Sequence, residues 1–470
     1  MIVDFLNELD NVLYYPILLI VLAAGGLYFT FRTRFVQIRL FKEACGLIVE
    51  QPHDGSGVSS FQALMVSTAS RVGTGNIVGI STALCLGGPG SVFWMWLMAI
   101  IGAASAFAES TLAQIYKRKG DSEDDCYGGP AYYIKHALHK PWLAMVFCVF
   151  LILTYAFGFN LLASYNLQST FTAYSFYNPK ITPAVIGAVL AVLVAICLFG
   201  GGKRIVKITS FIVPIMGIVY ILVSLIVIAV NYKNIPSMFV EIFKDAFDFK
   251  AIFGGVAGSC MILGIKRGLY SNEAGVGSAP NASASAVVSH PVKQGLVQTV
   301  SVYIDTLLIC TATALMCLGS GTPRNAAVSG APYVQNAIST VLGNFGPIFI
   351  TIAMILFAFT TLLGNLYYVD NAIIFLNKNK RPSKVFMSVF YLLCVAVVFA
   401  GAVMPMEACW ALADITMGGM ALINIPVCLM LSGIVVKACR DYERQKKEGI
   451  NPVFLAKNIG IDEDSVDFWK

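Results

Sequence analysis

The sequence predicts an all-α integral membrane protein with about eleven transmembrane helices. Hydrophobic residues make up 57% of the 470 residues and charged residues only 12%, whereas a soluble domain carries about a quarter charged residues. The apolar residues gather in stretches of about 20 or more, the length that crosses a bilayer. Two of these stretches, which open the two halves of the chain, are interrupted by glycines.

The expected order is one leading helix followed by two sets of five. The interrupted helix runs outward in the first set and inward in the second, so the two sets are expected to form an inverted repeat. We expect a leading helix and linker over 1–57, repeats over 58–231 and 250–437, an outer loop over 232–249 and a tail over 438–470. The expected spans are 11–31, 58–87, 90–117, 141–172, 182–200, 207–231, 250–267, 294–319, 345–376, 384–404 and 409–437.

Basic residues set the expected orientation. Acidic residues precede the first stretch where a secretory signal has basic ones, so this stretch is expected to be a true span. Of the 32 Lys and Arg, Arg71 falls within a span and only five fall in outer loops: Lys180, Lys233, Lys244, Lys250 and Arg324. The positive-inside rule therefore predicts a multi-pass protein of the cell membrane with its N-terminus outside and its tail in the cytoplasm. The outer loops 232–249 and 320–344 could carry short gate helices.

The composition argues against several other functions. The net charge of +6 follows from the basic inner loops, so it does not indicate binding to nucleic acid. The twelve cysteines and four histidines show no spacing typical of metal ligands or paired thiols. The chain also lacks His-Glu-x-x-His and Gly-x-Ser-x-Gly, so we do not expect an enzyme. No feature indicates an obligate protein partner.

The most informative segment is residues 70–77, which read Ser-Arg-Val-Gly-Thr-Gly-Asn-Ile within an otherwise apolar span. Unwound backbone at membrane depth is tolerated only where it is buried in protein or lines a cavity, so this run predicts a binding site. The half-helix beginning near Asn76 would point free N–H groups at the bilayer centre and suit a carboxylate. The carbonyls from Ala69 to Val72 would suit a cation such as sodium.

Two other interpretations of this run are weaker. Gly75 and Gly79 fit a Gly-x-x-x-Gly packing face, but such a face does not need Arg71, Thr74 and Asn76. A nucleotide-binding loop would need a different last spacing and a preceding strand.

The second glycine-rich segment covers residues 254–277. Counting about ten residues at 1.5 Å each from the outer end near residue 250 reaches the midplane around residues 258–261. Gly258 and Ser259 are therefore expected at the substrate level. The charged residues that follow would lie toward the inner vestibule and either form a gate or pair with one another: Lys266, Arg267 and Glu273.

Span nine contains two adjacent hydroxyls, Thr360 and Thr361. Hydroxyls inside a helix usually bond back to carbonyls one turn earlier. Placed against the carbonyls of Ala69 and Val72, they would instead complete an all-oxygen sodium site. The residues alone leave both alternatives open.

Charged residues within spans need partners or a function. Arg71 is the basic residue nearest the bilayer centre, and Asp305 is the acid most expected to reach the cavity, because hydroxyl-bearing residues surround it in the sequence. We treat Arg71, Arg267 and Asp305 as candidates for gating or coupling, with pairing across helices as the structural alternative. The other acids within or near spans are Glu109, Asp370, Glu407 and Asp414.

Several motifs closely resemble those of the alanine or glycine:cation symporter family, often called sodium:alanine symporters. They are residues 72–77, 87–96 (Gly-Gly-Pro-Gly-Ser-Val-Phe-Trp-Met-Trp), 264–268 (Gly-x-Lys-Arg-Gly), 271–280 and 305–306. The resemblance runs from the first span to residues 451–454 in the tail. It implies the inverted five-plus-five fold of the LeuT-like amino-acid transporters with one extra leading helix, and sodium-driven inward transport of a small neutral amino acid.

The resemblance also implies roles for individual residues. Thr74, Gly75 and Asn76 would bind the carboxylate and amine of the substrate. The carbonyls of Ala69 and Val72 and the hydroxyls of Thr360 and Thr361 would bind sodium, the coupling ion. No other cofactor is implied.

Two positions depart from the family pattern. Ala163 lies in the fourth span where glutamine is usual, and Asn365 lies in span nine where tryptophan is usual. Both are smaller than the usual side chains, so we expect a larger or more polar cavity. The resulting hypothesis is that glutamine or serine competes at least as well as alanine or glycine.

Two alternatives concern the transport mechanism. Proton coupling on the same fold would need a titratable centre such as Asp305 or Glu109. A channel is less expected, because the sequence contains no repeated carbonyl-filter motif.

Overall fold

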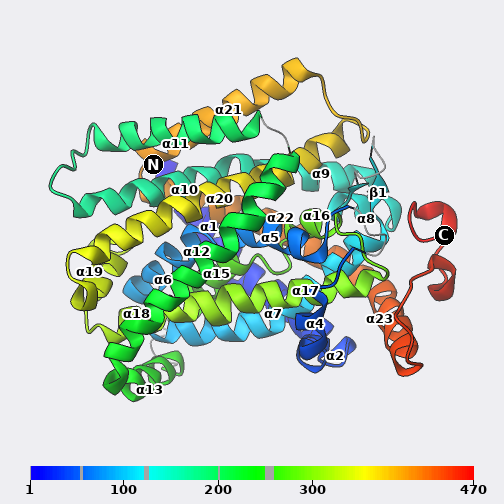
Figure 1. Cartoon of the computed structure of the whole chain (residues 1–470), viewed down its shortest axis with the longest axis horizontal. Helices are drawn as coiled ribbons and strands as arrows, with labels where there is room; N and C mark the ends of the chain where they lie inside the picture. The colour runs from blue at the N-terminus through cyan, green and yellow to red at the C-terminus, as the bar shows by residue number, and fades with distance from the viewer. Residues whose placement is uncertain (1, 53–56, 121–125, 200–201, 249–258) are drawn as a thin grey trace.

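The computed structural model describes residues 2–52, 57–120, 126–199, 202–248 and 259–470, which fold almost entirely into helices (Figure 1). Within these residues, eight helices are long and apolar enough to cross a membrane: Asp4–Arg32, Gly90–Ile115, Pro141–Ala173, Ile205–Val230, Pro291–Gly319, Phe345–Leu376, Lys384–Val403 and Met406–Met430. Thr182–Leu198 is a shorter apolar helix, and the two glycine-interrupted helices are broken. The predicted fold class is confirmed, while the count of eleven spans stays a prediction.

The elements follow the expected order. The leading part contains α1 (Ile2–Val12), η1 (Leu13–Leu18), α2 (Leu19–Arg32), α3 (Val36–Arg39) and α4 (Phe41–Leu47). The first set contains α5 (Ser60–Arg71), η2 (Thr74–Asn76), α6 (Val78–Thr82), η3 (Ala83–Gly87), α7 (Gly90–Ile115), β1 (Arg118–Lys119), β2 (Cys126–Tyr127), α8 (Pro130–His136), α9 (Pro141–Ile152), η4 (Leu153–Gly158), α10 (Phe159–Ser169), η5 (Thr170–Ala173), α11 (Thr182–Leu198) and α12 (Gly202–Val230). Between the sets lie η6 (Tyr232–Asn234) and α13 (Ile235–Ala246).

The second set contains α15 (Cys260–Asn272), α16 (Ala279–Ser283), α17 (Pro291–Val302), η8 (Tyr303–Cys310), α18 (Thr311–Gly319), η9 (Ala326–Val328), α19 (Ala331–Leu342), α20 (Phe345–Leu376), α21 (Lys384–Val403) and α22 (Met406–Met430). The tail contains α23 (Ser432–Lys447), η10 (Ala456–Ile459) and η11 (Glu463–Ser465). Both long loops expected on the outer side carry a helix, α13 and α19, as predicted.

The leading span lies across both sets, because α1 packs against α22 and α2 packs against α7. Its middle part is a wide π-type turn that contains Pro16. Proline cannot donate the backbone hydrogen bond of a regular helix, so the wider turn accommodates it.

Helices at corresponding places in the two sets pack against one another. α7 lies beside α17, α10 beside α20, and α11 beside α21. Figure 1 shows α7 and α17 along the lower side of the molecule and α11 and α21 along the upper side. This scaffold buries almost every residue of the broken helices α5, α6, α15 and α16.

The tail folds back onto the end of the bundle near the paired strands β1 and β2 (Figure 1). Asp467 pairs with Arg118 at 2.6 Å, and Nε1 of Trp469 donates to the carbonyl of Gln114 at 2.8 Å. The N–H of Phe454 donates to the carbonyl of Ser289 at 2.9 Å. The tail therefore joins the end of α7 to the loop before α17.

Candidate functional site

The first helix break lies where the sequence predicted it. α5 ends at Arg71, and the chain passes through the short η2 segment before α6 begins at Val78. The N–H of Gly73 donates to Oδ1 of Asn76 at 2.8 Å. This side-chain acceptor takes the place of a helical carbonyl and holds the backbone open.

Two close contacts explain the glycines of the first break. A Cβ at Gly73 would collide with the hydroxyl of Thr361 on α20. A Cβ at Gly75 would lie 2.6 Å from the ring of Tyr270 on α15. The first break is thus in close contact with α20 at Gly73 and with α15 at Gly75.

The second break lies between α15 and α16. The backbone there adopts positive φ at Glu273 (52°), Gly275 (83°) and Gly277 (93°). Such conformations suit glycine and strain other residues, so the glycines allow the turn.

The expected position of the second break was wrong. Ser259 caps the start of α15, where its hydroxyl accepts from the N–H of Ile262 at 3.3 Å, and Gly258 lies outside the described residues. The 13 residues of α15 separate Ser259 from the break by about 20 Å at 1.5 Å per residue. Tyr270 and Ser271 are the residues that reach the level of Gly75.

The two adjacent hydroxyls of α20 lie in different surroundings. Oγ1 of Thr361 is buried against Gly73 and has no hydrogen-bond partner among the described residues. Oγ1 of Thr360 donates back to the carbonyls of Leu356 at 2.9 Å and Phe357 at 3.2 Å. The structure therefore brings Thr361 to the break but turns Thr360 away, in the way common for hydroxyls inside helices.

The carbonyl end of α5 lies directly against α20. A Cβ at Gly364 would approach the N atom of Ser70 to 2.8 Å and the carbonyl carbon of Ala69 to 3.3 Å. Ala69 and Val72 are buried, with exposed fractions of 0% and 1%. The structure thus brings the end of α5, with Ala69 and Val72, against the segment of α20 that carries Thr361 and Gly364.

The side-chain amide of Asn76 holds the first break in place through hydrogen bonds. Its Nδ2 donates to Oδ1 of Asp305 at 2.7 Å and to Oγ of Ser271 at 3.1 Å, while its Oδ1 accepts from Gly73. The polar atoms of Asn76 are thus engaged with the protein. Asp305 also accepts from Ser271 at 2.8 Å and from Thr306 at 2.9 Å, so it joins the two breaks to η8.

One face of α10 is directed at the first break. Nδ2 of Asn166 donates to Oγ1 of Thr74 at 3.0 Å, and Asn160 accepts from Nδ2 of Asn365 at 2.9 Å. Ala163 lies three residues from each of these asparagines, so it shares their face of the helix. The structure therefore places Ala163 toward the candidate site.

Asn365 does not leave an open space where a tryptophan is usual. Its Oδ1 accepts from Oγ of Ser70 at 2.8 Å, and its Nδ2 donates to Asn160. Oγ of Ser70 also donates to Oε1 of Glu273 at 3.0 Å, and Oγ of Ser278 donates to Oε2 of the same carboxylate at 2.5 Å. Asn365 thus belongs to a polar network that joins both breaks to α10.

Arg71 is a buried cation among buried acids. Its Nη1 donates to Oε1 of Gln298 at 3.1 Å, whereas Nε and Nη2 have no partner among the described residues. Three buried acids lie close enough for their charges to interact with that of Arg71: Glu109, Glu273 and Asp305. Glu109 accepts from Nδ2 of Asn424 at 2.7 Å and from the N–H of Gly275 at 3.3 Å.

The two basic residues of α15 pair with acids that lie far away in the sequence, and neither pairs with Glu273. Arg267 pairs with Asp414 at 2.5 Å, and Lys266 pairs with Asp10 at 2.6 Å. The Arg267 guanidinium lies 3.7 Å from the ring centre of Trp410. Glu273 instead bonds to Ser70 and Ser278, so of the two alternatives that the sequence left open, mutual pairing of these three charges is wrong.

Aromatic rings close one side of the first break. The ring of Tyr270 lies 4.6 Å from that of Phe159 and 4.9 Å from that of Trp410. Both Trp410 and Arg267 approach Gly79 in α6. Arg267 thus lies beside the half-helix that leads to the expected outer side, and not toward the inner vestibule as we expected.

Several polar atoms around the first break are buried without partners in the described part of the chain: Nε and Nη2 of Arg71, Oδ1 of Asn166 and Oγ1 of Thr361. Buried polar groups normally find partners, so a group of unpaired ones marks a place where a ligand can bind.

Sequence reasoning missed Asn166, Tyr270, Gln298 and Trp410. For Asn166, a signal was available, because asparagines at 160 and 166 flank Ala163 on one helix face. The other three contact residues far away in the sequence, and nothing local indicated these contacts.

The fold and the paired helix breaks define a LeuT-like secondary transporter. The structure is similar to that titled "Crystal structure of MhsT in complex with L-phenylalanine", with a TM-score of 0.58 and 14% identity over 83% of this chain and 93% of that chain. The sodium:alanine symporter family model matches residues 1–456, and the chain belongs to this family. The predicted family is thereby confirmed, and the protein is a multi-pass membrane transporter and not an enzyme.

Two bacterial relatives cover nearly the whole chain. The chain is 43% identical to the amino-acid carrier protein AlsT of Bacillus subtilis, over 97% of this chain and 96% of the relative. It is 41% identical to a Bacillus subtilis protein named "Probable sodium/glutamine symporter GlnT", over 98% of this chain and 94% of the relative.

Proposed function

We propose that this protein imports a small neutral amino acid together with sodium by alternating access around the first helix break. The observation that carries this proposal is the group of unpaired polar atoms at that break, in a chain of the sodium:alanine symporter family. A sodium gradient directed into the cell would make the direction of transport inward. A ligand shifts such an equilibrium only by binding one state better than the other, so sodium must favour one state.

The sodium site that we propose consists of the carbonyls of Ala69 and Val72 and the hydroxyl of Thr361. The end of a helix presents carbonyls with a partial negative charge, which suits a cation. Thr361 supports this assignment because its oxygen is buried and unpaired beside Gly73. Thr360 is left out of the site, because its hydroxyl is bonded to its own helix.

The substrate site that we propose lies next to it, on the other side of Gly73. Thr74 and the N–H groups near Gly75 would receive the carboxylate, since the start of a half-helix favours an anion. Asn166, which the sequence did not indicate, would add its unpaired Oδ1 as an acceptor for the amine. Asn76 would position these groups and not contact the substrate.

Thr361→Ala tests the sodium assignment, with Thr360→Ala as the matched control. Removing one sodium ligand should weaken the apparent sodium affinity about tenfold or more, since 1.4 kcal/mol corresponds to a factor of ten. Thr360→Ala should change it little. The measurement is uptake into proteoliposomes across a series of sodium concentrations. Equal loss of sodium dependence in both variants would contradict the assignment.

The substrate proposal is that glutamine or serine competes at least as well as alanine or glycine. The supporting observation is the small Ala163 on the helix face between Asn160 and Asn166. Unlabelled competitors in the same uptake assay test it. Strict preference for alanine would overturn it, and Ala163→Gln should shift preference toward the smaller substrates.

Proton coupling on the same fold has one supporting observation. Asp305 is fully buried, and its hydrogen-bond donors are the neutral side chains of Asn76, Ser271 and Thr306. A pH gradient that drives uptake without sodium, and that fails to do so in Asp305→Asn, would favour protons over sodium.

A further inference from the structure

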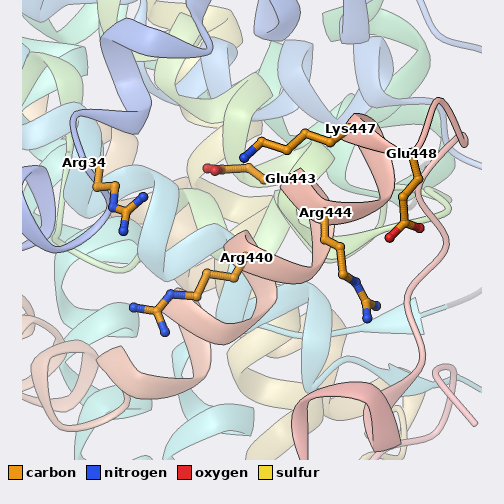
Figure 2. A pocket seen from close by; sticks show the side chains of 6 residues that line it. All are labelled: Arg34, Arg440, Glu443, Arg444, Lys447 and Glu448. Atoms are coloured by element: carbon orange, nitrogen blue, oxygen red, sulfur yellow. The ribbon is translucent and has the colours of Figure 1, made fainter.

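A basic pocket lies far from the helix breaks, between the start of α3 and the helix α23. It encloses about 480 Å³ and is lined by four basic and two acidic residues: Arg34, Arg440, Glu443, Arg444, Lys447 and Glu448 (Figure 2). The excess of basic side chains makes it a site for an anion.

Three of the four basic residues form no ion pair within the described part of the chain. Arg444 pairs with Asp441 at 2.6 Å, but no ion pair involves Arg34, Arg440 or Lys447. Arg39 outside the pocket pairs with Glu443 at 2.6 Å, which neutralises one of the two acids.

The unpaired cations are directed to the same side. Figure 2 shows the ends of Arg440 and Lys447 extending toward the side on which Arg34 lies, while Arg444 and Glu448 turn the other way. Arg34 itself adopts a positive φ of 56°, a conformation that side-chain-bearing residues rarely take. The backbone turn places Arg34 beside α23.

The pocket residues follow the ends of two candidate membrane spans. The candidate span in the leading part ends at Arg32, two residues before Arg34, and the span of α22 ends at Met430 just before α23. Oη of Tyr28 lies 3.0 Å from Oγ of Ser432, which joins the ends of these two spans. Lipid headgroups occupy this level of a bilayer.

An apolar groove opens near the pocket along the same segment. It encloses about 500 Å³ between α3, α4, α7, the end of α17 and η8, and its lining includes Ile38, Phe41 and Leu308. Ile38 follows Arg34 by four residues and is 55% exposed. Residues 34–41 contribute to both the cationic pocket and the apolar groove. The pocket matches the charged headgroup of an anionic phospholipid, and the groove matches an acyl chain.

We propose that an anionic phospholipid occupies this place, with its phosphate among Arg34, Arg440 and Lys447 and an acyl chain in the groove. Basic pockets at the bilayer surface attract anionic headgroups by about 1 kcal/mol per Lys or Arg, which corresponds to about fivefold in affinity. The lipid would hold α23 against the leading span.

The test adds phosphatidylglycerol, phosphatidylcholine or inorganic phosphate to the full-length protein in detergent and measures its unfolding temperature. Phosphatidylglycerol should raise that temperature in a saturable manner, and the other two should not. The variant Arg34→Gln/Arg440→Gln/Lys447→Gln should need about a hundredfold more phosphatidylglycerol for the same rise. Native mass spectrometry of the purified protein should show bound anionic lipid that this variant lacks.

The matched control is Lys378→Gln/Lys380→Gln/Lys384→Gln, which removes three exposed basic residues, two from the loop between α20 and α21 and one from the first position of α21. It should respond to phosphatidylglycerol as the unchanged protein does. An equal response of both triple variants would overturn the proposal, as would an equal effect of phosphatidylcholine. If inorganic phosphate alone reproduced the stabilisation, the pocket would be a site for a soluble anion and the lipid assignment would be wrong.

Discussion

The two helix breaks occupy corresponding places in the inverted repeat but are built differently. The first break is held open by one amide side chain, Asn76, and by contacts of Gly73 and Gly75 with neighbouring helices. The second is held open by three closely spaced positive-φ residues, Glu273, Gly275 and Gly277. The first break therefore forms without a positive φ at any residue from 70 to 77, whereas the second requires positive φ at three residues.

The breaks also differ in how their polar groups are paired. Around the first, polar atoms of Arg71, Asn166 and Thr361 are left without partners in the described residues. At the second, Asn272 bonds to Thr306 and Ala274, and Glu273 accepts from Ser70 and Ser278. This difference favours the first break as the ligand site that we propose, with the second break as its support.

Asn76→Asp is expected to have the largest effect. It would replace the donor to Asp305 by a second buried carboxylate and also repel the carbonyls nearby. Leaving a buried charge uncompensated costs about 3–5 kcal/mol, so the yield of folded protein and the unfolding temperature in detergent should fall sharply. Adding Asp305→Asn should restore most of the stability, because one carboxylate then faces an amide again. Without such rescue, Asn76 and Asp305 are not coupled as the structure indicates.

The glycines of the two breaks should respond differently to alanine. Gly277→Ala places a Cβ within 2.9 Å of Asn424, Phe147 and Pro130 at a positive φ, and the combined strain and overpacking should cost about 2–4 kcal/mol.

Gly73→Ala meets one obstacle, the hydroxyl of Thr361, at an ordinary φ. Adding Thr361→Ala should therefore restore folding to Gly73→Ala, but not its sodium dependence. The measurements are the unfolding temperature and sodium-dependent uptake, and failure to restore folding would show that the collision is not local.

A smaller effect is expected at Ser278. Ser278→Ala removes a donor to the carboxylate of Glu273, and a hydrogen bond to a charged group contributes about 1.5–3 kcal/mol. Ser283→Ala is the matched control and should cost less, because within the described residues its hydroxyl bonds to neutral groups, Ser110 and the carbonyl of Ala279. Denaturant or thermal unfolding in detergent compares the two. If the control were the more damaging variant, the support role of the second break would be wrong.

The sequence was sufficient to predict the first break because its signal is local. Two glycines, a hydroxyl and an amide within one apolar span would destabilise a continuous membrane helix unless they lined a cavity or lay buried in protein. The second break was misplaced because glycines recur at 258, 264, 268, 275 and 277, and hydropathy does not distinguish among them. The choice depends on which glycines adopt positive φ, which is decided by tertiary contacts.

Partners across the fold were the hardest part to predict. Thr360 and Thr361 are neighbours in the sequence, but successive residues of a helix point about 100° apart, so only one of them could face Gly73. Arg267 and Asp414 are 147 residues apart, and several other acids were equally plausible partners from the sequence alone. The residue types in the sequence predicted what kind of site to expect. Contacts between helices determine which residues form it.

The dependence of the first break on α20 has a consequence for biosynthesis. Ser70 and its partner Asn365 are separated by 295 residues. At about 5–20 residues per second, the ribosome needs about 15–60 seconds to make the intervening chain. During that interval the end of α5 is already made while Asn365, Thr361 and Gly364 do not yet exist. The first break, where we propose the ligand site, is therefore among the last parts of the protein to be assembled.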